Sequence, residues 1–145
     1  MLRWACLLIF VSTCFAQELT IRVLNAKDGK PLPEESVTVQ FLGQAAAPPP
    51  LQLQTDQIGE ARFDVPTPSP KVLSVRVVLT SERWHCACSV MTETAKVVRD
   101  GVTQAPPRKD EQSSKSNLIA KPGEIVVVAR PFTLLEKLLF PLLKE

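Results

Sequence analysis

The chain has no tyrosine, only one histidine and only five glycines among its 145 residues. One histidine cannot supply the two imidazoles of an HExxH motif or the three of a His₃ centre, so zinc hydrolases of these types are excluded. Basic and acidic residues nearly balance, 17 against 15, and a net charge of +2 argues against the concentrated basic surface that nucleic-acid binding requires. The sequence also has no Gly-rich phosphate loop and no G-x-S-x-G nucleophile motif, and we expect no enzymatic activity.

Residues 1–16 have the order of a secretory signal peptide. Arg3 precedes an apolar run over residues 4–11, and the segment ends in Cys-Phe-Ala, with a small residue at its last position, Ala16. The apolar run is much shorter than the about 20 residues that cross a bilayer, which argues against a retained membrane helix. We therefore expect cleavage after Ala16 and export to the periplasm or the cell exterior.

A second processing route is an alternative. Residues 11–14 read VSTC and loosely resemble a bacterial lipobox, in which Cys14 would become a lipidated N-terminus. Thr13 departs from the Gly or Ala that usually precedes the cysteine in such a motif. Either route takes the domain out of the cytoplasm, and lipidation would contribute to holding it at a membrane.

From residue 17 onward, apolar and polar residues alternate with a period of two. Such alternation, rich in β-branched residues, is typical of strands with one buried face. The expected strands are residues 18–25, 36–42, 51–55, 61–65, 73–79, 84–90 and 123–130. Turn-forming residues separate them, so residues 17–131 are predicted to form a mainly β domain, an antiparallel Ig-like or transthyretin-like β-sandwich of about seven strands.

Two segments break this pattern within the predicted domain. Residues 92–101 begin with Thr92, a suitable N-cap, and end with a glycine, so we expect a short helix there. Residues 104–117 are polar, charged and proline-containing, and they are expected to form a loop.

Two motifs give the first half of the chain a resemblance to a known family. Residues 25–33 read NAKDGKPLP, and residues 55–63 read TDQIGEARF. Together they resemble the carboxypeptidase regulatory-like domain, a transthyretin-like sandwich related to the Cna B-type repeat of surface adhesins. Residues 122–126, PGEIV, followed by a Leu-rich tail, resemble a bacterial secreted subset of that family. The resemblance implies a sandwich that acts as an accessory module, without peptidase activity.

The cluster HCAC at residues 85–88 is the candidate for metal or thiol chemistry. On one strand, Cys86 and Cys88 project to the same side and His85 to the other. Two thiolates at this spacing can bind a soft ion such as Cu(I) if a third ligand is supplied elsewhere. Alternatively, both cysteines are buried apolar residues that share a face with Trp84, or they form disulfides within or between chains. No other cofactor is expected.

Residues 132–145 are predicted to form a C-terminal amphipathic helix. Thr133 and Glu136 have the spacing of a capping box. The apolar residues expected to make external contacts are Leu134, Leu135, Leu138, Leu139, Phe140 and Leu142. They exceed what one small face needs, so we expect them to contact a partner protein or the surface of a membrane. In the alternative, the helix packs over an open end of its own sandwich.

Taken together, these features predict an exported, non-catalytic binding or structural module of the bacterial cell envelope. It would recognise an envelope protein through sandwich edges or loops. A metal- or thiol-handling envelope protein that uses Cys86 and Cys88 is the first alternative. The second is a carbohydrate-binding module, although the chain after residue 16 has no tyrosine and only one tryptophan, Trp84, for an aromatic platform.

Overall fold

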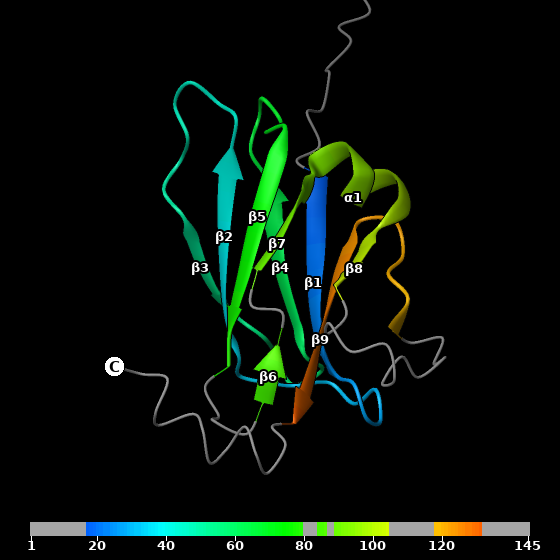
Figure 1. The fold of residues 1–145 in the computed structure, drawn as a ribbon. Coiled ribbons are helices and arrows are strands. Elements are labelled where there is room, and N and C mark those ends of the chain that lie inside the picture. Colours follow the sequence, from blue (N-terminus) through cyan, green and yellow to red (C-terminus); the bar gives the residue numbers. More distant parts are fainter. Residues whose placement is uncertain (1–16, 80–83, 87–88, 105–117, 132–145) are drawn as a thin grey trace, which may run out of the picture.

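The computed structural model describes residues 17–79, 84–86, 89–104 and 118–131. These residues form nine strands and one helix: β1 (Gln17–Asn25), β2 (Ser36–Leu42), β3 (Leu51–Gln54), β4 (Glu60–Val65), β5 (Val72–Val78), β6 (Trp84–Cys86), β7 (Ser89–Glu93), α1 (Thr94–Asp100), β8 (Val102–Gln104) and β9 (Glu124–Pro131). Sheet A has the order β4-β1-β9-β6, with β8 also paired to β9, and sheet B has the order β3-β2-β5-β7 (Figure 1). The predicted β-sandwich is confirmed.

Six of the predicted strands agree with β1 to β5 and β9 to within one residue at each end. The prediction of one strand over residues 84–90 is wrong, because this segment divides between the two sheets. β6 pairs with β9 in sheet A, whereas β7 pairs with β5 in sheet B. β8 was not predicted, since three residues are too few to show an alternation.

The sandwich is not purely antiparallel. Of the seven strand pairings in the described residues, five are antiparallel, and β9 runs parallel to both β1 and β8. β9 begins beside α1, because the N–H of Gly123 donates to the carbonyl of Val97 in that helix at 2.8 Å. The N–H of Thr20, near the start of β1, donates to the Gly123 carbonyl at 3.0 Å. Both strands therefore start at the same end of the molecule and run in the same direction.

α1 confirms the predicted short helix but begins differently. Its N-cap is Glu93 rather than Thr92, and no side-chain hydrogen bond caps it. At the other end, Gly101 has a φ of 73° and its N–H donates to the Val97 carbonyl. Val97 is fully buried, so the helix closes one end of the sandwich, at the top of Figure 1.

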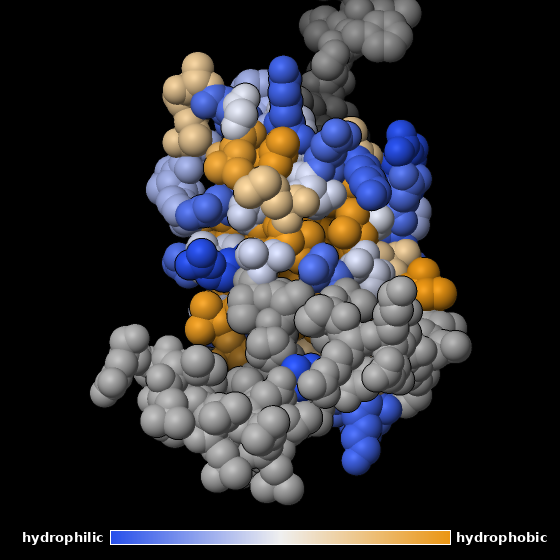
Figure 2. Space-filling view, in the orientation of Figure 1, coloured by the Kyte–Doolittle hydropathy of each residue, from blue (hydrophilic) through white to orange (hydrophobic). Residues whose placement is uncertain are grey.

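The core lies between the sheets and is made by the inward members of each alternating strand. They include Leu19, Ile21 and Val23 of β1, Val37, Val39 and Phe41 of β2, Leu73, Val75 and Val77 of β5, and Ile125 and Val127 of β9. The rings of Phe41 and Phe63 meet from opposite sheets in a tilted arrangement, with centroids 6.1 Å apart. Figure 2 shows hydrophobic residues in the middle of the view, between hydrophilic residues on either side.

β9 is buried on both faces. Its outward Val126 and Val128 pack with Leu24 in a second small cluster, against which Leu118 and Ala120 also pack. A strand covered on both sides reads as a continuous apolar run rather than an alternation, which explains the sequence of residues 125–128.

Two turns meet at the end of the sandwich opposite α1. The N–H of Val23 donates to the Gly59 carbonyl at 2.9 Å, and the N–H of Leu32 donates to the Val23 carbonyl at 2.9 Å. Gly59 has a φ of 71°, and a Cβ there would lie 2.8 Å from the Cβ of Pro31 and 2.9 Å from the oxygen of Val23. We call this contact between residues 25–35 and 55–60 the turn lock.

Thr55 completes the turn lock with a buried hydroxyl. It donates to the Leu32 carbonyl at 2.8 Å and accepts from the N–H of Glu35 at 2.9 Å. Next to it, the carboxylate of Asp56 accepts from the N–H groups of Ile58 and Glu60. The residues that carry the family resemblance in this motif therefore have structural roles.

The turn lock predicts that Gly59→Ala destabilises the fold. The positive φ costs a non-glycine residue about 1–2 kcal/mol, and the added methyl must displace backbone, for about 1–3 kcal/mol more. Gly123→Ala is the matched control, because its φ is 81° but nothing lies within 4 Å of the added carbon. Urea unfolding of both variants, followed by circular dichroism, measures the difference. Equal losses in the two variants would contradict the close contact.

The hydroxyl of Thr55 gives a second prediction. Thr55→Val removes the buried hydroxyl that donates to the Leu32 carbonyl and accepts from the Glu35 N–H, and the expected loss is about 1–3 kcal/mol in the free energy of unfolding. Thr38→Val removes an exposed hydroxyl that donates to the side chain of Gln52, and it should change stability by no more than about 0.5 kcal/mol. A comparable loss in Thr38→Val would argue against a special role for the buried hydroxyl.

Candidate binding surface

The predicted metal or thiol cluster is only partly within the described residues. β6 places His85 opposite Arg130 and Cys86 opposite Ala129 of β9, and Cys88 lies outside the described residues. The expected strand that carries both cysteines does not continue to residue 90, because β6 belongs to sheet A and β7 to sheet B. Within the described ranges, no three His, Cys, Asp or Glu side chains gather in a way that could hold a metal ion. Soft-metal binding by Cys86, Cys88 and His85 stays a prediction.

The predicted C-terminal contact residues, from Leu134 to Leu142, also lie outside the described residues. External contact by this segment therefore stays a prediction. In the part of the chain that the structure describes, no helix is long and apolar enough to cross a membrane.

Sheet B presents a mostly polar outer face. Along β2 and β5, the residues between the buried valines point outward, and the register forms two rows, with Thr38 opposite Arg76 in one and Gln40 opposite Ser74 in the other. The flanking strands extend both rows, with Gln52 opposite Thr38 and Met91 opposite Ser74. Four strands thus bring together side chains that are far apart in the sequence.

This face is hollowed. A depression of about 470 Å³ is lined by Thr38, Gln40, Gln52, Ser74, Arg76, Ser89 and Met91. Arg76 is the one charged residue among them, and it makes no ion pair with any described residue. Met91, on β7, is 72% exposed, and Val78, two residues after Arg76 on β5, is 52% exposed. Arginine and methionine are residue types enriched at protein interfaces, and no aromatic ring is among the lining residues.

Sheet A is different, because the chain itself covers part of its outer face. Residues 118–120 lie over β9, fixed by the hydroxyl of Thr103, which donates to the Leu118 carbonyl at 3.1 Å and accepts from the Ala120 N–H at 3.0 Å. Arg22 pairs with Glu124 at 3.1 Å, and the same carboxylate oxygen accepts from the N–H of Lys121. These contacts within the chain occupy side chains and backbone groups on the outer face of sheet A.

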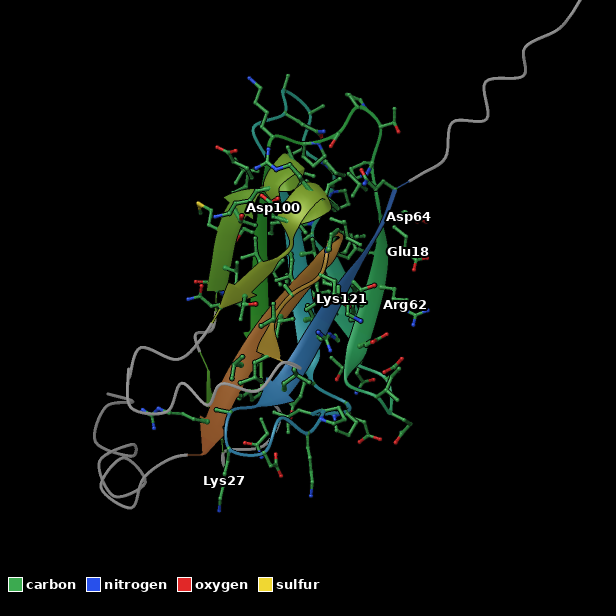
Figure 3. The ribbon with its side chains drawn as sticks, turned by 90° about the vertical axis from the view of Figure 1, so that its right-hand side faces the viewer. Glu18, Lys27, Arg62, Asp64, Asp100 and Lys121 are labelled. Carbon is green, nitrogen blue, oxygen red and sulfur yellow. The ribbon has the colours of Figure 1, made fainter. Side chains whose placement is uncertain are left out.

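The edges of the two sheets also differ. Figure 3 shows Glu18, Arg62 and Asp64 in a row beside β4, one edge strand of sheet A. Arg62 donates to Glu60 at 2.8 Å, and this hydrogen bond, with the charge of Glu60, raises the pKa of Arg62 above its usual value. Charged side chains protect an edge strand from pairing with another chain. β3, one edge strand of sheet B, reads LQLQ and carries no charge.

No family model matches the chain, and no curated protein matches it in sequence. Among solved structures, it is similar to the full-length major pilin SpaD from Corynebacterium diphtheriae, with 11% sequence identity and a TM-score of 0.46. The match covers 81% of this chain and 30% of the pilin chain, so the chain corresponds to less than a third of that protein. The likeness concerns the chain fold alone. Membership of the carboxypeptidase regulatory-like family stays a prediction.

The charged edge of β4 predicts an effect on self-association. Replacing Arg62 and Asp64 together by threonine removes two of the three charged side chains of β4 without changing the net charge, and we expect the variant to associate more strongly than the unaltered chain. The matched control replaces Arg99 and Asp100 by threonine, which also removes one charge of each sign, here from the exposed ion pair at 2.9 Å on α1. Light scattering during size-exclusion chromatography measures both. Unchanged association of the β4 variant, or equal gains in both, would contradict a protective role.

Proposed function

We propose that this chain is an exported, non-catalytic binding module of the bacterial cell envelope. It recognises a protein partner through the outer face of sheet B and the adjoining edge of β3. The observation that carries this proposal is the difference between the two sheets. Sheet A has a partly covered face and charged side chains on its β4 edge, whereas sheet B has a hollowed face and no charged side chain on its β3 edge.

The chemistry of the hollow indicates what the partner presents. Arg76 stands among hydroxyl and amide groups, with exposed apolar surface beside it at Met91 and Val78. A guanidinium without an ion-pair partner can donate two parallel hydrogen bonds to a carboxylate, and such charged hydrogen bonds are stronger than neutral ones. The partner surface that fits best has one acidic side chain, surrounded by neutral polar groups and an apolar contact for Met91.

The edge of β3 adds a second mode of contact. Among the described strands, β3 pairs with β2 alone, so one side of its backbone is not used in the sheet. Leu51 and Leu53 are half-buried against the core, which holds the strand in place, while Gln52 and Gln54 point outward. An extended segment of the partner can pair with such an edge through main-chain hydrogen bonds.

Export is supported by the order of residues 1–16, in which a positive residue and an apolar run precede a small residue at the expected cleavage position. The apolar residues of 132–145 would then hold the module against its partner or a membrane surface.

Site-specific photo-crosslinking in an exporting bacterial host tests the proposal. A photoreactive residue at position 91 of the full precursor should form an adduct with one protein of the envelope, and the same residue at position 62 should not. Adding Arg76→Glu should lower the yield at position 91 by about tenfold, the effect of roughly 1.4 kcal/mol in binding.

Arg62→Glu is the control for this charge reversal, because Arg62 is also exposed but lies on the edge of sheet A. It should leave the yield at position 91 unchanged. Equal adducts from positions 91 and 62, or a yield at position 91 that ignores Arg76→Glu, would refute recognition by sheet B. Circular dichroism of each variant confirms that the fold is kept.

A further inference from the structure

Gln17 lies at the start of β1 and beside a second hollow. This hollow, of about 710 Å³, lies where β1, the start of β5 and α1 come together, and its lining includes Gln17, Lys71, Glu93 and Val98. Gln17 is exposed, and its side-chain amide makes no hydrogen bond with the described residues. The side chain is therefore free to turn, and there is open space next to it.

We propose that, once the leader is removed after Ala16, Gln17 cyclises to pyroglutamate. The mature chain then begins with an uncharged lactam at the rim of this hollow. The inference rests on the proposed export, since only cleavage at this bond makes Gln17 an N-terminal residue.

The reaction is internal to one residue. The α-amine nitrogen attacks Cδ of the same side chain, a new amide bond forms between them, and the bond from Cδ to Nε2 breaks. The amine gives up one proton to the departing group, which leaves as ammonia, so no oxidant, reductant or other reactant is needed. Closure of a five-membered ring gains from the high effective concentration of two groups held on one residue.

The fold accommodates the product. Gln17 lies opposite Val65 at the end of the β1–β4 ladder, and the lactam nitrogen keeps one hydrogen while the carbonyl of residue 17 is untouched. The backbone groups that the ladder uses at this position are thus retained.

The charges around the hollow are also consistent with a neutral terminus. Lys71 and Glu93 are the charged residues in its lining, one of each sign, and Val72 and Val98 contribute apolar surface. An α-ammonium group would add a second positive charge there, whereas a lactam leaves the balance unchanged. The lactam also removes the free amine that aminopeptidases need, an advantage outside the cytoplasm.

Mass spectrometry of the full precursor, expressed in an exporting host and denatured directly from the cells, tests this. We expect a chain that starts at residue 17, is lighter than the free-amine form by one ammonia, and resists stepwise degradation from the N-terminus. Gln17→Asn is the matched control. It keeps the amide but could close only a four-membered ring, so it should be cleaved at the same bond and retain its free amine.

The outcomes separate the two proposals. A chain that starts at residue 17 with its full mass and an open amine overturns cyclisation and leaves export standing. A precursor of full length overturns export, and cyclisation with it. A chain that starts at a lipidated Cys14 overturns cyclisation alone, because the module is still exported.

Discussion

The close approach of Gly59 to Val23 and Pro31 is the constraint on which the rest of the structure depends. Between residues 55 and 59 the chain passes from sheet B to sheet A, and it can do so this tightly only because residue 59 has no Cβ. The buried hydroxyl of Thr55 then ties the crossing to the turn after β1. This contact joins the end of β1 and the turn that follows it to the passage between the two sheets. The motif that suggests a family thus serves folding, and the proposed recognition is assigned to other residues.

The strands could be predicted because, in a strand with one buried face, every second residue is apolar. β2 was predicted at residues 36–42 for this reason, and its bounds agree. The same rule failed at residues 84–93, where the alternation of Trp84, Cys86 and Val90 continues through a change of sheet. Alternation reports that a side is buried, but it does not report which strand lies beside it. Alternation also did not predict the parallel pairing of β9 with β1, because this pairing follows from the path of the chain around α1.

The candidate surface was harder to predict than the fold. Thr38, Gln40, Ser74 and Arg76 fall on outward positions of predicted strands, but a solvated face and a binding face have the same alternation. The hollow exists because the register sets the row of Gln52, Thr38, Arg76 and Ser89 next to the row of Gln40, Ser74 and Met91, and register is a property of four strands together. The cysteines and the Leu-rich tail, by contrast, stand out by composition alone, without any knowledge of contacts.

The two sheets differ in their edges and outer faces, and one physical rule explains the difference. Every exposed edge and apolar face of a sandwich invites contact, and a protein must cover it, charge it or use it. Sheet A follows the first two courses, with Val126 and Val128 beneath residues 118–120 and Arg62 on its edge. Sheet B follows neither within the described residues, since β3 is uncharged and Met91 lies open beside an unpaired guanidinium. Surface left in this state exposes apolar area without stabilising the fold, and the proposed recognition by sheet B assigns a use to it.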